Sequence, residues 1–183
     1  MNTRQLPFPA MLPLTDQGSA ASLLLDKLTQ IPFAHFELCI KQLLVALGYE
    51  RPQSLGRRYF RGGAKTGGAD IQTFLATDRI AVPVLVVLKQ FKRDVQLRYV
   101  DELRGSLARR RVTHGLIVTT SRFPKRAEEA ARSGDSRIDL IDGETLAGLL
   151  LTYGIGVKTI QTTSIAVDDD YFETLGEAEE GSV

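Results

Sequence analysis

Apolar positions along the chain follow two spacings, and each spacing predicts a different kind of element. The apolar run that leads into Gln90 is long enough for a strand buried on both faces, so we predict a central strand over 82–92. Over 33–47 the apolar positions recur at the spacing of one helical face, and Gly48 supplies the left-handed residue that ends a helix. Other predicted elements are helices over 20–30, 95–110, 124–133 and 143–153, and strands over 69–75, 113–120 and 137–141. This order predicts an α/β sandwich with a central mixed sheet flanked by helices.

The two ends of the chain are predicted to lie outside this domain. Residues 1–19 are rich in proline and small polar residues, which is typical of an extended arm, and the residues 168–183 are acidic, which is typical of a mobile tail. The β-branched segment 156–167 predicts an added edge strand. Two glycine pairs predict a turn between the strand over 69–75 and an extended segment at 58–60. The domain itself is therefore expected over 20–167.

Composition favours one domain and disfavours several kinds of site. With 183 residues, 43% of them apolar, the chain suits a single core. Cys39 is the only cysteine and there are two histidines, so we expect neither a disulfide framework nor a zinc cage. No apolar run reaches membrane-spanning length and no leader is seen, so we expect a cytoplasmic protein without membrane contact. The net charge is only +1, yet basic residues gather between Lys89 and Arg111.

Polar residues at the end of the central strand suggest phosphodiester chemistry. Gln90 and Lys92 would share one strand face, and Asp70 begins the neighbouring strand. A carboxylate, the amide oxygen of Gln90, the Phe91 carbonyl and waters suit Mg²⁺, while an ammonium group steadies the attacking water and the phosphate charge. The alternative interpretation is that the strand simply ends in solvent and that Asp70 has only a structural role in the adjoining turn. Glu37 is likewise either a helix-rim residue or a functional carboxylate.

Several motifs, in this order, resemble the catalytic domain of Mrr-like restriction endonucleases over roughly residues 22–173. They include Phe36-Glu37, Gly67-Gly68-Ala69-Asp70, Gln90-Phe91-Lys92-Arg93, Gly115 to Phe123 and Leu140-Ile141-Asp142-Gly143. The resemblance implies the PD-(D/E)xK nuclease fold, a three-layer sandwich, and hydrolysis of DNA, in the branch where Gln replaces the second acid. It implies that Asp70 binds the metal, Gln90 replaces the second acid, Lys92 is the motif lysine and Glu37 is the helix carboxylate.

Three departures from the family pattern bear on this expectation. The family usually has a small residue where Phe91 stands, and another acid where this chain has Lys65-Thr66. Family members often carry a separate winged-helix DNA reader, and this chain leaves no room for one. Target choice is then expected to come from a separate recognition subunit, from an assembly, or not to be made at all.

The resulting hypothesis is a Mg²⁺-dependent DNA endonuclease of restriction-type defence, with Mn²⁺ as a substitute and a homodimer expected because both DNA strands are cut. Predicted phosphate contacts are Arg93, Arg98, Arg104, Arg109, Arg110 and Lys125. A solvated helix face is the alternative for these residues. Two other functions stay open at this point: a catalytically decayed domain that binds DNA or an assembly, and a small-molecule sensor on a Rossmann-like sheet.

Overall fold

The computed structural model describes residues 17–55, 68–76, 80–160 and 164–175. The predicted extended segment at 58–60, and the arm as far as residue 16, lie outside these residues. The helices are α1 (Gln17–Gln30), α2 (Phe33–Ala46), α3 (Arg98–Arg110), α4 (Lys125–Arg132), α5 (Gly143–Tyr153) and α6 (Asp169–Thr174). The strands are β1 (Tyr49–Ser54), β2 (Ile71–Ala76), β3 (Ala81–Lys89), β4 (His114–Thr119), β5 (Arg137–Ile141), β6 (Val157–Ile160) and β7 (Ser164–Val167).

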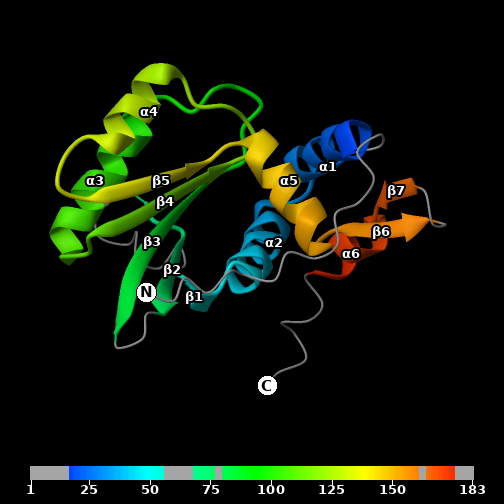
Figure 1. Cartoon of the computed structure of the whole chain (residues 1–183), viewed down its shortest axis with the longest axis horizontal. Helices are drawn as coiled ribbons and strands as arrows, with labels where there is room; N and C mark the ends of the chain where they lie inside the picture. The colour runs from blue at the N-terminus through cyan, green and yellow to red at the C-terminus, as the bar shows by residue number, and fades with distance from the viewer. Residues whose placement is uncertain (1–16, 56–67, 77–79, 161–163, 176–183) are drawn as a thin grey trace, which may run out of the picture.

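The predicted three-layer architecture is confirmed. Strands β1 to β5 form one sheet in sequence order, antiparallel from β1 to β3 and parallel from β3 to β5. Figure 1 shows this sheet between α3 and α4 on one side and α1, α2 and α5 on the other. The mixed sheet follows from its connections, because β3 reaches β4 through α3, and β4 reaches β5 through α4, whereas β2 turns back directly into β3.

The central strand β3 is buried on both faces, as its apolar run predicts. Val84, Val86 and Leu88 pack into the core on the side of α1, α2 and α5. Leu85 and Val87 pack into the core on the side of α3 and α4. The strand ends at Lys89, three residues before the predicted end, so Gln90 and Lys92 lie beyond it. The shared strand face that we expected for these two residues therefore does not arise from regular strand alternation.

Strand β1 is not predicted from the sequence. It contains Pro52 and an irregular register between Glu50 and Gln53, with Arg51 at a positive φ of 50°. Its exposed and half-buried positions do not alternate with period two, because β1 lies at the edge of the sheet and carries a bulge. The apolar alternation that reveals a strand is therefore missing from this segment.

The C-terminal segment differs from both predictions made for it. Strands β6 and β7 pair only with each other in an antiparallel hairpin and do not extend the main sheet. The residues after Val167 form α6 instead of starting a mobile tail, and Phe172 is fully buried in the main core. The packed part of the chain therefore continues to Leu175, which is also buried.

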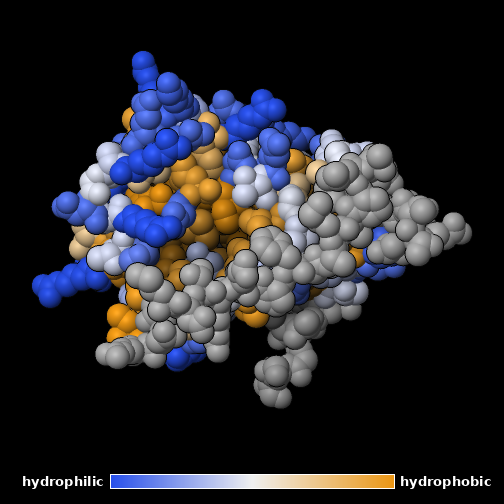
Figure 2. All heavy atoms as spheres, viewed as in Figure 1, coloured by the Kyte–Doolittle hydropathy of each residue, from blue (hydrophilic) through white to orange (hydrophobic). Residues whose placement is uncertain are grey.

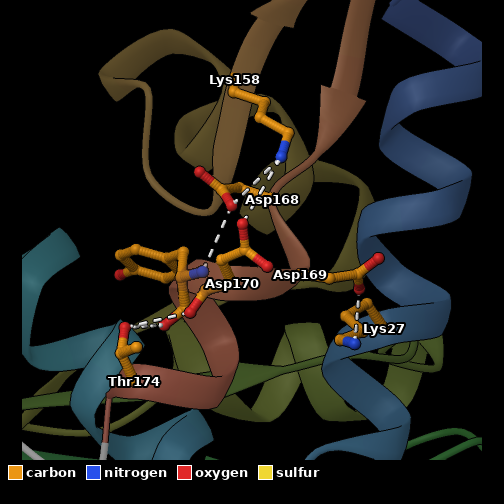
Figure 3. Close-up of polar contacts among 7 residues, drawn as sticks. Lys27, Lys158, Asp168, Asp169, Asp170 and Thr174 are labelled. Atoms are coloured by element: carbon orange, nitrogen blue, oxygen red, sulfur yellow. Dashed lines mark hydrogen bonds and ion pairs between the residues drawn. The ribbon is translucent and has the colours of Figure 1, made fainter.

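The acidic residues that led us to predict a tail have defined hydrogen-bond and ion-pair partners. Asp168 accepts a hydrogen bond from the Tyr171 amide at 3.2 Å and so begins α6. Figure 3 shows Lys158 between Asp168 and Asp170, and Lys27 of α1 beside Asp169. The Lys27 Nζ lies 2.5 Å from the Asp169 carboxylate. Within the described residues, no helix combines the length and the apolar character that crossing a bilayer requires.

Candidate active site

The candidate site lies at one edge of the five-stranded sheet. Strand β2 begins at this edge, whereas β1, β3, β4 and β5 end there, because β1 and β2 are antiparallel and β3 to β5 are parallel. The predicted residues Asp70, Gln90 and Lys92 adjoin these strand ends. The start of α2, which carries Glu37, reaches the same edge next to the end of β1. A sheet edge that collects strand ends in this way is a common place for a binding site in α/β proteins.

Asp70 extends the pairing of β2 with β3 through both its main chain and its side chain. Its amide donates to the Val86 carbonyl at 2.8 Å, and its Oδ2 accepts from the Leu88 amide at 2.7 Å. Burial raises the pKa of the Asp70 carboxyl, while the Leu88 amide and the charge of Lys89 lower it and the charge of Glu37 raises it. A carboxylate that is rigidly held and costly to ionise is a typical cation-binding group.

Glu37 connects α2 to the end of β1. Its Oε1 accepts a hydrogen bond from the Ser54 hydroxyl, and the Lys41 ammonium lies 3.9 Å away, one helical turn further on. The carboxylate on the apolar helix stripe thus has polar partners, which explains how it is tolerated beside the core. Because its charge also acts on Asp70, the structure brings these two predicted carboxylates into one electrostatic environment.

Gln90 ties the end of β3 to the junction of α1 and α2. Its side-chain Nε2 donates to the carbonyls of Leu28 and Ile31, each at 2.7 Å. In a continuous helix the Leu28 carbonyl would accept from residue 32, but Pro32 has no N–H, so the Gln90 amide takes over that role. These bonds use both N–H groups of the amide and leave its oxygen for another partner.

Lys92 lies in different surroundings from Asp70. It lines an open hollow of about 590 Å³ at the ends of β4 and β5, together with Leu25 of α1. Four carboxylates, Asp94, Glu128, Asp142 and Glu144, share this hollow with Lys92 and Arg122. The Phe91 carbonyl, which we expected to face the metal, accepts from the Thr120 hydroxyl at 2.9 Å. The sequence positions of Gln90 and Lys92 are close, yet each contacts different elements.

Sequence reasoning overlooks Lys89 and the aromatic pair beside it. The Lys89 Nζ lies 4.6 Å from the centroid of the Tyr99 ring, and the Arg98 guanidinium lies 4.8 Å from the same ring. The Phe91 ring packs against Tyr99 at 5.7 Å, and Arg93 lies 5.9 Å from Phe91. The bulky Phe91 therefore packs on the α3 side. An available signal was the spacing of aromatic and basic residues at 89, 91, 93, 98 and 99.

The predicted phosphate contacts divide into three groups. Arg93 and Arg98 lie at the candidate edge, as does Lys125 at the start of α4, where it pairs with Glu129 at 4.0 Å. Arg104 donates to the carbonyls of Ala130 at 2.5 Å and Ser136 at 3.4 Å, so it holds α3 against the end of α4 instead of pointing to a ligand.

The last two basic residues of α3 lie away from the site. Arg109 and Arg110 stand at the far end of α3, about 18 Å from Arg98 at 1.5 Å per residue. Figure 2 shows that hydrophilic side chains cover the surface over α3 and α4. The predicted phosphate contacts thus include a cluster at the site and a second pair at the opposite sheet edge.

The predicted site residues carry oxygen donors of the kind that Mg²⁺ prefers. Asp70 and Glu37 each supply a carboxylate, and Gln90 supplies an amide oxygen. Among the described residues, no three His, Cys, Asp or Glu side chains gather closely enough to hold a metal. Mg²⁺ is commonly held by one or two carboxylates, with waters and phosphate oxygens supplying the other positions. The position of the expected further acid, at Lys65-Thr66, lies outside the residues that the structure describes.

Comparison with known proteins gives a consistent result. Residues 28–150 match the restriction endonuclease family Mrr_cat. Over 158 residues the chain is 29% identical to the type IV methyl-directed restriction enzyme EcoKMrr of Escherichia coli strain K12, a match that covers 86% of this chain and 50% of the relative. The chain thus spans about half the length of that curated relative.

Two solved structures share the fold. The DNA modification-dependent restriction endonuclease AspBHI matches with a TM-score of 0.60 and 19% identity, over 100% of this chain and 45% of its own. MspJI, solved in complex with a 27-mer oligonucleotide, matches with a TM-score of 0.51 and 19% identity, over 100% of this chain and 39% of its own. The family match covers more than half of the chain and agrees with the motif order. The chain therefore belongs to the Mrr catalytic-domain family of restriction endonucleases.

Proposed function

We propose that this chain is a metal-dependent DNA endonuclease domain that acts in restriction-type defence. The observation that carries the proposal is the carboxylate of Asp70, held at 2.7 Å by the Leu88 amide at the edge where four strands end and one begins. Burial raises the pKa of this carboxyl, which means that its surroundings disfavour the ionised form. In the proposed enzyme a bound cation would offset this cost, which gives the buried carboxylate a function.

Asp70 and Gln90 are the proposed metal ligands, through a carboxylate oxygen and the amide oxygen. Gln90 suits this role because its amide nitrogen is occupied by Leu28 and Ile31, which fixes how the oxygen is presented. When bound, Mg²⁺ or Mn²⁺ would supply Lewis-acid polarisation of the phosphate and of a water. A neutral amide in place of a second carboxylate predicts a modest metal affinity.

The protein's own groups have two further tasks in hydrolysis. The water oxygen forms a bond to phosphorus, the phosphorus–oxygen bond to one sugar breaks, and the departing oxygen takes up a proton. Lys92 is proposed to steady the attacking water and the growing negative charge, since its side chain is exposed and can reach a bound strand. Glu37 is proposed to support Asp70 from α2, held in place by Ser54 and Lys41.

Double-stranded DNA is the proposed partner. Arg93, Arg98 and Lys125 lie at the site edge and suit phosphate contacts, which orient a duplex without reading its sequence. Arg109 and Arg110 are proposed to contact DNA further along, from the opposite end of α3. Because two copies would present one active site to each strand of a duplex, a homodimer is proposed, with target choice supplied by a recognition module or subunit. MspJI was solved with an oligonucleotide, which supports DNA as the ligand of this fold.

Plasmid cleavage tests this function. Supercoiled plasmid from methylating and non-methylating hosts is incubated with the protein and Mg²⁺, Mn²⁺ or a chelator, because EcoKMrr is methyl-directed. We expect nicked and linear DNA with either metal, none with chelator, and a loss of at least about 100-fold for Asp70→Ala. Lys158→Ala is the matched control, because Lys158 forms its ion pairs with Asp168 and Asp170 at α6, away from the site. Wild-type rates for Asp70→Ala would reject the assignment.

A catalytically decayed DNA-binding domain is the second candidate, and one observation favours it. Gln90 already has a structural role, because its amide donates to the Ile31 carbonyl and to the Leu28 carbonyl, which Pro32 leaves without a helical donor. In that case DNA binding persists in electrophoretic mobility shifts, while neither metal nor DNA modification produces any cut. The small-molecule sensor loses its basis, because the match is to a nuclease family and Gln90 has a defined contact.

A further inference from the structure

Two lysines flank Gln90, and they lie in contrasting surroundings. Lys89 is the last residue of β3 and follows Val87, which packs on the α3 and α4 side. Its Nζ stands 4.6 Å from the centroid of the Tyr99 ring on α3. Lys92 faces the hollow that Leu25 of α1 lines. The family pattern singles out Lys92, so Lys89 has no assigned role.

The Asp70 carboxylate is held beside the end of β3. Asp70 precedes the regular pairing of β2 with β3, which starts at Ile71 and Val86, and its amide donates to the Val86 carbonyl at 2.8 Å. The hydrogen bond from the Leu88 amide to Asp70 Oδ2 at 2.7 Å holds the carboxylate next to the Lys89 position. Val87 and Lys89 share one face of β3 by alternation. The charges of Lys89 and of Glu37, which lies on α2, both act on the Asp70 carboxyl.

The charged groups around Lys89 and around Lys92 differ in how strongly they would attract an anionic ligand. The hollow at Lys92 holds four carboxylates against two cationic side chains, so Lys92 by itself supplies only part of the attraction for a phosphate. Around Lys89 the cationic groups of the aromatic cluster are Arg98 and Arg93, both exposed, while Glu102 is a carboxylate whose charge acts on Arg98. Cationic groups therefore outnumber carboxylates around Lys89, which favours a phosphodiester there, and the Asp70 carboxylate lies beside this position.

Lys89 is also held firmly at both its backbone and its side chain. Its carbonyl accepts from the Thr119 hydroxyl at 2.7 Å and from the Thr120 amide at 3.2 Å. The Tyr99 ring holds the ammonium by a cation–π contact, and the ring itself is fixed between Phe91 and Arg98. A side chain positioned before the substrate binds loses little freedom on binding, which is how catalytic groups are commonly supported.

We propose that Lys89 is a catalytic residue of the proposed nuclease, and that its ammonium group contacts a non-bridging oxygen of the scissile phosphate beside Asp70. This role is additional to that of Lys92 and rests on the proposed function. The interaction is electrostatic: Lys89 neutralises part of the charge that grows on the phosphate oxygens, and no bond to lysine forms or breaks.

Removal and chemical restoration of the charge test this role. Lys89→Cys is expected to reduce single-turnover cleavage by about 100-fold. Alkylation with 2-bromoethylamine turns the introduced thiol into an aminoethyl thioether with an ammonium at nearly the position of lysine, and we expect it to restore at least a tenth of the rate. Cys39 will not react under these conditions, because it is fully buried and burial raises the pKa of its thiol to about 12. Lys158→Cys, carried through the same treatment, is the control and keeps wild-type cleavage throughout.

A second measurement does not depend on cleavage or on metal. DNA affinity is measured by fluorescence anisotropy in chelator at several salt concentrations for the wild type and for Lys89→Cys before and after alkylation. Loss of one phosphate contact lowers the slope of log affinity against log salt by about one, and restoring the ammonium restores that slope. The alkylated protein also shows that a loss in Lys89→Cys does not come from misfolding, because a misfolded protein would not recover.

The outcomes separate this proposal from the proposed function. If the wild type cuts and Asp70→Ala does not, while Lys89→Cys cuts within threefold of the wild type, the role of Lys89 is rejected and the nuclease stands. Lost cleavage that alkylation fails to restore also rejects the role. If the wild type never cuts, the catalytic role falls with the nuclease, whatever the salt slope shows. Lost cleavage with both rate and slope restored supports the proposal.

Discussion

The Asp70 carboxyl lies where burial disfavours its ionised form. Burial is the largest influence on its carboxyl and raises its pKa above the ordinary value of 3.8. An acid whose pKa is raised by folding stabilises the folded state in its neutral form. That stabilisation is complete below the unfolded-state pKa and is lost as the pH rises through the folded-state pKa. At neutral pH the ionised Asp70 therefore makes the fold less stable than a neutral side chain of the same shape would.

Because ionisation of Asp70 costs folding free energy, we predict that Asp70→Asn is at least as stable as the wild type at pH 7. The Asn oxygen still accepts the hydrogen bond from the Leu88 amide, while the ionisation cost disappears. We expect the free energy of unfolding to rise by up to about 1 kcal/mol at pH 7, with a smaller gain near pH 4. Urea unfolding followed by circular dichroism at both pH values measures it. A variant clearly less stable than the wild type at pH 7 would show that the charge of Asp70 serves the fold.

The sequence indicated the right edge of the sheet but not how its side chains are used. The sequence predicted that Asp70 and Gln90 lie at the same sheet edge. The prediction rested on the apolar run before Gln90 and on the position of Asp70 at the start of a strand, because strand order follows from the connections. Alternation along a strand assigns a residue to a face, yet both faces of this sheet are covered by helices. It could not show that Gln90 would bind carbonyls next to Pro32, or that Lys89 would act on Asp70.

At the scale of elements, burial explains which helices and strands could be predicted from the sequence. Elements with a regular apolar period, such as α2 and β3, are predicted to within a few residues. Strand β1 lacks that period, because it is a bulged edge strand, and the hairpin of β6 and β7 pairs only with itself. The acidic sequence at Asp168 resembles a solvated tail, but the buried ring of Phe172 anchors it. One aromatic residue outweighs several exposed charges, because its burial contributes more than a surface ion pair.

The contact between Gly156, just before β6, and Phe172 of α6 is sensitive to a single substitution. Gly156 has a positive φ of 70°, and a Cβ at this position would run into the Phe172 ring. Gly156→Ala is therefore expected to lower the free energy of unfolding by about 2–3 kcal/mol, from backbone strain and displacement of Phe172 together. Urea unfolding measures the loss, and fluorescence of the tyrosines reports the displacement.

Gly148→Ala supplies the matched control. Gly148 lies within α5, and a Cβ there meets nothing within 4 Å, so alanine should stabilise the protein by about 0.5–1 kcal/mol through its helix propensity. Opposite signs for the two variants, together with changed tyrosine fluorescence in Gly156→Ala, would support the packing of Phe172 of α6 against Gly156 in solution. Equal effects would show that the contact with Phe172 contributes little to the folded state.

For the whole molecule, the proposed function raises the question of how one candidate edge would cut two DNA strands. The chain carries one Asp70, and the two strands of a duplex run in opposite directions, so two copies related by a two-fold axis would present one site to each strand. The net charge of +1 makes broad, non-specific attraction between copies and DNA weak. Under the proposed function, local contacts from residues such as Arg93 and Arg98 would then position the duplex at each copy.

Mixing active and inactive copies tests this arrangement with the full chain. Wild type is mixed with increasing amounts of Asp70→Asn at constant total protein, and supercoiled plasmid is the substrate. In a dimer, mixed pairs hold one competent site, so the ratio of nicked to linear product should rise steeply as Asp70→Asn is added. Sedimentation velocity at the same concentrations shows whether the copies associate. A constant product ratio across the whole series would mean that each chain cuts both strands in separate events, because then inactive copies only dilute the active ones.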